Sequence, residues 1–169
     1  MSHLIYDLTI TTLLRSLSNL DAIVSKAEAH VAADEHLEPE TLIQARLYPN
    51  MAPFVFQIRV ATDTAKGAAA RLSGSEVPSW ADDEQTFPEV HERIGKAITY
   101  LESFEPGQFE GAEDRTIELK LGPRTIEFTG RTYVSHFVLP NFFFHVTTAY
   151  DILRHSGVVL GKRDFLGGA

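Results

Sequence analysis

Apolar residues recur at intervals of three and four positions along three long segments of the chain, the spacing that places side chains on one face of an α-helix. Polar and charged residues fill most positions between them, as on a helix that packs one face against a core. We therefore predict three long amphipathic helices, over residues 6–31, 54–72 and 86–104. Their apolar stripes are Tyr6, Ile10, Leu13, Leu17, Leu20, Val24, Ala27 and Val31; Phe54, Ile58, Ala61, Ala65, Ala68 and Leu72; and Phe87, Val90, Ile94, Ala97, Leu101 and Phe104.

Local signals mark where these helices begin and end. Thr86 is followed three residues later by Glu89, the spacing of a capping box in which each side chain satisfies a free N–H of the first turn. Gly74 supplies the left-handed residue that commonly follows a helix. A short helix is expected over residues 40–48. The loop 75–84, which carries Trp80, should then join the second long helix to the third.

A fourth helix is predicted over residues 139–157. Pro140 suits its first turn, where a missing N–H costs nothing, and the glycine at its end suits a left-handed position. Three consecutive phenylalanines, residues 142–144, precede His145. Asn141 lies four residues before His145, so the two side chains share a helix face. A polar stripe among so many aromatic residues is the clearest indication of a site in this chain.

Between the third and fourth helices the periodicity changes to two. Residues 116–121 and 125–128 alternate apolar and polar side chains, and Gly122 and Pro123 separate them, which is typical of a β-hairpin. We therefore predict an all-α fold, an up-down-down-up four-helix bundle with a small hairpin before its last helix. A single domain should span residues 1–169, because a chain of this length can bury a core of its own.

Composition excludes several classes of partner. The formal charge of −8 and the lack of a lysine and arginine cluster argue against nucleic acid and anionic membranes, which both need a basic surface. No apolar stretch approaches the length of about 20 residues that spans a bilayer. The chain has no cysteine, which excludes disulfides and thiolate chemistry and fits a cytoplasmic protein. The acidic residues 82–84 are expected to be solvated.

Four polar side chains are candidates for binding a small molecule: Gln57, His136, Asn141 and His145. Gln57 stands among apolar residues of the second helix, so it should face inward and meet the Asn141 and His145 stripe. His136 precedes the fourth helix and could fold over the mouth of a pocket. The same residues also fit a hydrogen-bonded core pair that fixes the register of two helices, since buried polar groups are usually paired. Both interpretations stay open.

The alternative is a degenerate metal site in an enzyme, with His145, His136 and a carboxylate such as Asp63 as ligands. A helix that supplies two histidine ligands usually spaces them by four residues, and Ala149 occupies that position after His145. No nucleophile elbow, phosphate loop or His-Glu-x-x-His motif occurs. We predict binding without a metal or other cofactor, and leave open whether the chain is an enzyme. A dimeric interaction module without a small-molecule role is a third possibility.

Several segments together resemble a known family. They are the whole stretch 139–158, residues 161–167, Pro49-Asn50-Met51 followed by Gln57, the segments 65–66 and 71–74, and the helix start at Glu84, Thr86 and Phe87. These residues are similar to an uncharacterised bacterial family of unknown function. That family is grouped with the DinB/YfiT-like helical bundles, a superfamily of proposed metalloenzymes.

The resemblance implies the same up-down-down-up bundle and frequent dimers. Many superfamily members hold a divalent metal with three histidines, one on the second helix and two on the fourth. His145 resembles the first histidine of the fourth helix, whereas the second falls on Ala149 and the second-helix position falls near Gln57. One strong ligand is too few for an ordinary zinc site, which keeps three protein ligands even when it is catalytic.

The three phenylalanines also favour a homodimer. Residues 142–144 span about 200° of a helix at about 100° per residue, whereas a core-facing stripe covers roughly 100° or somewhat more. At least one of the three rings should therefore meet the hairpin, a loop or a second subunit.

Overall fold

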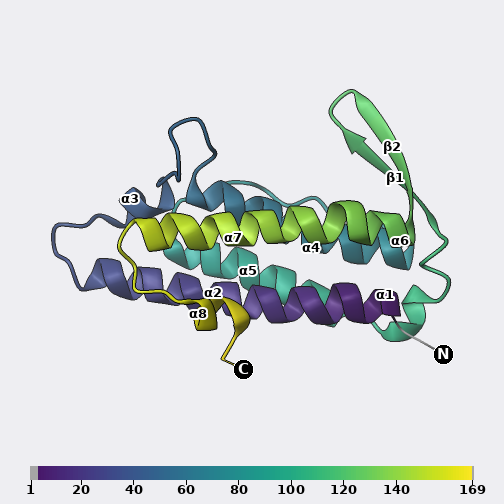
Figure 1. The fold of residues 1–169 in the computed structure, drawn as a ribbon, viewed down its shortest axis with the longest axis horizontal. Helices are drawn as coiled ribbons and strands as arrows, with labels where there is room; N and C mark the ends of the chain where they lie inside the picture. The colour runs from purple at the N-terminus through teal and green to yellow at the C-terminus, as the bar shows by residue number, and fades with distance from the viewer. Residues whose placement is uncertain (1–3, 169) are drawn as a thin grey trace.

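Four long helical segments pack side by side in the computed structural model, which describes residues 4–168 (Figure 1). The chain runs along the first segment, returns along the second, crosses back through a loop, follows the third in the same direction as the second and returns along the fourth. This is the predicted up-down-down-up order. The segments are α1 Leu4–Tyr6, η1 Asp7–Thr11 and α2 Thr12–Ala32; α4 Phe54–Ser73; α5 Phe87–Glu102; and α6 Gly130–Tyr133, η3 Val134–Val138 and α7 Leu139–His155.

Short elements complete the described chain. A helix, α3 Pro39–Ile43, lies in the first connection, and a 3-10 turn, η2 Pro106–Phe109, follows α5. The strands β1 Thr116–Leu121 and β2 Arg124–Thr129 form an antiparallel hairpin in which Ile117 lies opposite Phe128. A last helix, α8 Lys162–Leu166, packs on α2. None of the described helices combines the length and the apolar character needed to cross a membrane.

The predicted stripes form the core. Every predicted stripe residue except Tyr6, which is half-buried, lies in one continuous cluster of buried side chains. The alanines at 61, 65 and 68 are fully buried, and α4 has its most extensive contact with α7. Small buried side chains such as these let a neighbouring helix backbone approach α4 closely.

The predicted helix ends are confirmed at two places. The Thr86 hydroxyl accepts a hydrogen bond from the Glu89 N–H, and the Glu89 carboxylate accepts one from the Thr86 N–H, which is the expected capping box. Gly74 ends α4 with a φ of 78°, a left-handed conformation that glycine adopts without steric penalty. The short helix predicted over residues 40–48 is instead α3, which ends at Ile43.

The last helical segment begins earlier than its sequence pattern predicts. Pro140 does lie in the first turn of α7, but the chain is already helical from Gly130, where Thr129 caps it. The turn before α7 is a π-helix, and the Leu139 N–H donates to the Val134 carbonyl five residues back. This wider turn removes the clash that a proline ring normally makes with the carbonyl four residues before it, so the helix continues through Pro140.

The C-terminal tail docks only in part. Phe165 packs edge-on against Tyr150, with ring centroids 6.0 Å apart. Leu166, in contrast, keeps 49% of its surface exposed, although its backbone carbonyl accepts a hydrogen bond from Arg15. The tail therefore docks through the Phe165 side chain and not through the Leu166 side chain.

Candidate functional site

The predicted meeting of Gln57 with the polar stripe of the last helix takes place. The Gln57 Oε1 atom lies 2.7 Å from the His145 Nδ1 atom, across the α4–α7 contact. Gln57 is buried, and its amide nitrogen donates to the Ala52 carbonyl at 2.9 Å. Gln57 and His145 are 88 positions apart in the sequence, so the packing of α4 on α7 brings them together.

This pairing determines which ring nitrogen of His145 carries the proton. A backbone carbonyl only accepts hydrogen bonds, so Ala52 orients the Gln57 amide with its nitrogen toward that carbonyl. The Gln57 oxygen then faces His145 and can only accept, so Nδ1 carries the hydrogen and donates a hydrogen bond to it. Nε2 is left with a lone pair. No fully buried side-chain nitrogen or oxygen within residues 4–168 lacks a hydrogen-bond partner, so Nε2, which has none, reaches the surface.

Two aromatic rings flank the imidazole. Phe144 lies edge-on to it at a centroid distance of 5.1 Å, and Phe56 lies at 6.5 Å. Phe144 and Phe56 are 56% and 43% exposed, which is unusual for side chains of this size. The imidazole therefore lies beside partly exposed aromatic side chains from both helices.

Asn141 forms a second hydrogen bond between α4 and α7, one helical turn before His145. Its amide nitrogen donates to the Thr64 hydroxyl at 2.8 Å, and that hydroxyl donates to the Val60 carbonyl. Asn141 is half-buried and keeps its side-chain oxygen without a partner among the described residues. Gln57, Thr64, Asn141 and His145 line the α4–α7 contact, here called the α4–α7 seam. It presents two acceptors on one face of α7, the Asn141 oxygen and the His145 Nε2 atom.

The other predicted members do not join this group. His136 lies in the π-helical turn and is exposed, about 13 Å along the same helix from His145 at 1.5 Å per residue. The expectation that His136 precedes the helix and folds over a pocket is therefore not met. Asp63, the carboxylate of the alternative metal site, instead forms ion pairs with Lys66 at 2.7 Å and Arg93 at 2.9 Å.

The donors around His145 do not fit a divalent metal ion. Ala149 is buried and has no side-chain atom that could ligate a metal, and the Gln57 oxygen already accepts the hydrogen bond from His145. No three histidine, aspartate or glutamate side chains within the described residues come together as a metal site. No chemical step at this site is therefore assigned to a metal.

We expect His145 to titrate below its ordinary pKa of 6.5, because burial disfavours the charged ring. The unfolded chain would then bind a proton at this histidine that the folded chain does not, so stability should fall as the pH drops from about 6.5 toward the lowered folded pKa.

Long-range ¹⁵N NMR of the ring should show a proton on Nδ1 at neutral pH. A proton on Nε2 would contradict the assigned tautomer.

A buried charged network between α4 and α5 was not predicted from the sequence. Arg93, only 4% exposed, donates to the Thr62 hydroxyl, the Ala81 carbonyl and the carboxylates of Asp63 and Glu84. The expectation that residues 82–84 are solvated is wrong for Glu84, which is buried. A signal was present, since Arg93 lies on the buried stripe of the third helix between Val90 and Ala97.

Glu84 is held ionised by two arginines. Burial by itself would raise the pKa of its carboxyl group, but hydrogen bonds from Arg59 and the nearby charge of Arg93 outweigh burial and lower it. The loop containing Glu84 is thereby fastened to both helices. Trp80 in the same loop lies beneath the ammonium groups of Lys66 and Lys96, at 4.5 and 5.0 Å from its ring.

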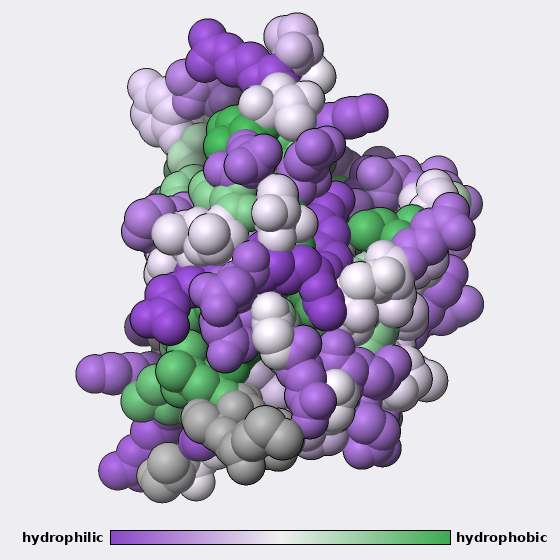
Figure 2. Space-filling model, turned by 90° about the vertical axis from the view of Figure 1, so that its right-hand side faces the viewer, coloured by the Kyte–Doolittle hydropathy of each residue, from purple (hydrophilic) through white to green (hydrophobic). Residues whose placement is uncertain are grey.

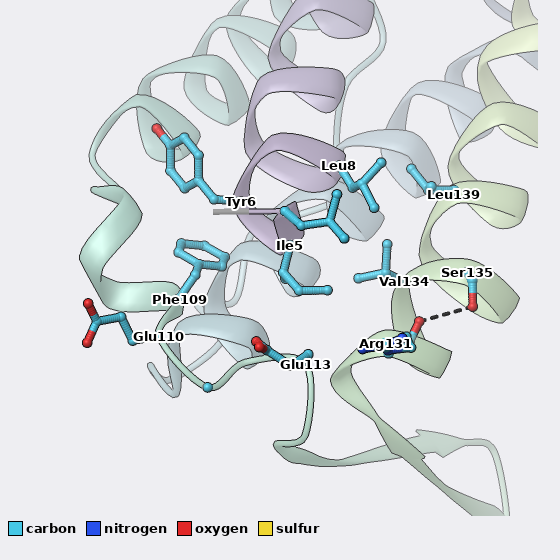
Figure 3. A pocket seen from close by; sticks show the side chains of 12 residues that line it. Ile5, Tyr6, Leu8, Phe109, Glu110, Glu113, Arg131, Val134, Ser135 and Leu139 are labelled. Carbon is cyan, nitrogen blue, oxygen red and sulfur yellow. Dashed lines mark hydrogen bonds between the residues drawn. The ribbon is translucent and has the colours of Figure 1, made fainter. Parts of the chain in front are cut away.

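Two cavities lie away from His145. One, of about 520 Å³, is lined by Trp80 and the charged side chains around it, so Trp80 both packs on the core and borders a cavity. The other, of about 500 Å³, lies at the end of the bundle where α1 begins (Figure 3). Neither is lined by Gln57, His136, Asn141 or His145.

Comparison with known proteins now identifies the family. The model of a domain of unknown function, DUF1993, matches residues 5–166. The chain belongs to this family. Comparison of this DUF1993 chain with curated proteins gives no match.

A solved structure agrees with the fold of this DUF1993 member. It is a DinB family member protein from Shewanella denitrificans, 38% identical, with a TM-score of 0.90 over 98% of this chain and 93% of the other. The predicted resemblance to an uncharacterised DinB-like family is therefore confirmed, and so is the predicted helical fold with its hairpin.

Proposed function

We propose that this DUF1993 chain binds a small molecule at the α4–α7 seam, without a metal. The ligand carries an O–H or N–H donor beside a flat apolar body. The observation that carries this proposal is the Gln57–His145 hydrogen bond, because it holds the imidazole as an acceptor at Nε2. Phe56 and Phe144 supply exposed apolar surface beside that acceptor.

A paired histidine can also be purely structural, and two features favour a binding role. The free nitrogen of His145 reaches the surface, where a ligand could contact it. Phe56 and Phe144 are both partly exposed, and exposed apolar patches commonly mark contact sites. The Asn141 oxygen offers a second acceptor on the same face of α7.

Phenol is a suitable probe, since it combines a donor with an aromatic ring. In NMR titrations at neutral pH, phenol should shift the His145 ring signals in a saturable manner, and anisole, which lacks the donor, should not. His145→Ala should weaken phenol binding about tenfold, the equivalent of one hydrogen bond. His155→Ala, at the other end of α7, is the matched control and should bind as the wild type does.

Stability measurements separate this role from a core role. His145→Ala leaves the buried Gln57 oxygen without its donor, so a loss of about 1–3 kcal/mol is expected from that atom alone. Replacing both partners, as Gln57→Leu with His145→Phe, should restore most of the stability but not phenol binding. A loss of several kcal/mol with no phenol binding by the wild type would assign His145 to the core.

A homodimer remains our second proposal, and the exposed Phe144 favours it. Of the three consecutive phenylalanines, Phe142 is fully buried and Phe143 packs against the core, so one ring is left outside as the helix geometry requires. Light scattering at micromolar concentration should give about twice the chain mass of 18.8 kDa. Phe144→Ser should reduce that mass, and Leu166→Ser, similarly exposed, should not. A wild-type mass near 18.8 kDa would contradict the dimer.

A further inference from the structure

The cavity of about 500 Å³ at the end of the bundle lies between η1 and η3, the two π-helical turns within residues 4–168 (Figure 3). One wall carries Leu4, Ile5, Tyr6 and Leu8 from α1 and η1, and the facing wall carries Val134, Ser135 and Leu139 from η3 and α7. In Figure 3 the side chains of Ile5 and Leu8 point across the gap toward Val134 and Leu139. Cavities of 300–1,000 Å³ with mainly apolar walls are typical ligand sites.

The two π turns are a second, independent observation. Fewer than about 1% of residues in globular proteins adopt this conformation, and it occurs frequently at functional sites. Pro140 accounts for the turn before α7, but no proline lies near Asp7–Thr11. There, Thr9 and Thr12 donate their hydroxyls to the carbonyls of Ile5 and Asp7 and so stabilise the wide turn. The wide turn is thus supported by the side chains of this segment.

The charged residues in the cavity lining favour one class of ligand. Glu110, Glu113 and Arg131 are the charged residues in its lining, which leaves a net negative charge. Glu113 is half-buried, and no ion pair or hydrogen bond to its carboxylate occurs within residues 4–168. Figure 3 places Glu113 and Arg131 at the same end of the cavity, and Figure 2, which looks onto this end of the molecule, shows apolar surface between hydrophilic side chains. A half-buried carboxylate without a partner favours a cationic group.

We propose that this cavity is a second binding site, for an amphipathic organic cation. The apolar part of the ligand lies between η1 and η3, and its ammonium group pairs with Glu113. The site is separate from the His145 site, because none of its lining residues contributes to the Gln57–His145 pair.

Calorimetry with n-octylammonium, octanoate and 1-octanol tests this proposal on the full chain. Octylammonium should bind with one site per chain, and octanoate should bind at least about tenfold more weakly because its charge meets Glu113. Glu113→Gln should weaken octylammonium about tenfold and leave octanol unchanged. Glu76→Gln, an exposed carboxylate in the α4–α5 loop, is the charge control and should have no effect.

A cavity-filling variant tests the location. Leu8→Trp should abolish binding of all three probes, and Leu47→Trp should not, although Leu8 and Leu47 are equally exposed at 39% and 38%. Both leucines are partly in solvent, so their replacement should leave the fold intact, which circular dichroism would verify. Equal binding of octylammonium and octanoate, or unchanged binding by Glu113→Gln or Leu8→Trp, would overturn the proposal, as would the failure of octylammonium to bind.

Discussion

Replacing Arg93 with methionine should lower the free energy of unfolding by about 3–5 kcal/mol, the range for removing one partner of a buried ion pair. The Arg93 side chain is 3% exposed and the Glu84 side chain 8% exposed, and the two groups lie 2.8 Å apart. Without the guanidinium, Glu84 keeps only Arg59 as a partner, and the Thr62 hydroxyl loses its donor. Urea denaturation at neutral pH would measure the loss.

Lys26→Met is the matched control for Arg93→Met. Lys26 and Asp164 also form a short ion pair, at 2.6 Å, but the Lys26 side chain is 51% exposed. Exposed pairs contribute about 0–1 kcal/mol, so this variant should be nearly as stable as the wild type. The loss of stability in Lys26→Met should also become smaller at high salt, whereas the loss in Arg93→Met should not. If Arg93→Met and Lys26→Met lost the same free energy of unfolding, burial would not explain the contribution of the Arg93 ion pairs to stability.

Gly130→Ala should destabilise the protein by about 3 kcal/mol, at the upper end of the usual range for overpacking. A Cβ atom at Gly130 would lie 1.7 Å from the Ala112 carbonyl oxygen and 2.8 Å from its carbon. These are backbone atoms, which cannot move aside by a side-chain rotation. The loop before β1 would have to shift away from the start of α6, and thermal unfolding would register the strain.

Gly95→Ala provides the control for the same chemical change. Gly95 lies exposed in the middle of α5, with nothing within 4 Å of the added methyl group. Alanine is the better helix former by about 0.5–1 kcal/mol, so this variant should be more stable than the wild type. A Gly130→Ala variant with wild-type stability would show that the loop carrying Ala112 adapts freely.

The Gly130 variant also bears on the cavity between the π turns. Gly111 and Glu113, which flank Ala112, line that cavity, and Arg131 follows Gly130. A shift of Ala112 would therefore move one side of the cavity mouth. Octylammonium binding should weaken in Gly130→Ala even at temperatures where the variant remains folded, whereas it should be unchanged in Gly95→Ala.

Part of the candidate site was predictable from local pattern. Asn141 and His145 share a face because they are four residues apart, and Gln57 lies among apolar residues that must face the core. Their meeting follows once α4 and α7 are neighbours. His136 could not be placed in this way, because the π turn before α7 extends the helix backward and leaves that residue on its exposed surface.

The charged network shows the opposite case. An acidic run such as residues 82–84 is usually solvated, and nothing within the loop indicates that Glu84 is buried. Its burial depends on Arg59 and Arg93, which lie 25 positions before it and nine after it on two different helices. Only the approach of α4 to α5 brings the two guanidinium groups to one carboxylate and offsets its desolvation.

By itself the sequence determined the features that arise within one turn or one strand: the apolar stripes, the Thr86 capping box, the left-handed Gly74 and the alternation of the hairpin. These depend on backbone geometry and on neighbours three or four residues away. Only the tertiary structure decided the tautomer of His145, the burial of Glu84 and the cavity between the two π turns. Each of these depends on which helix faces meet and at what distance, and those distances are set by packing across the whole core.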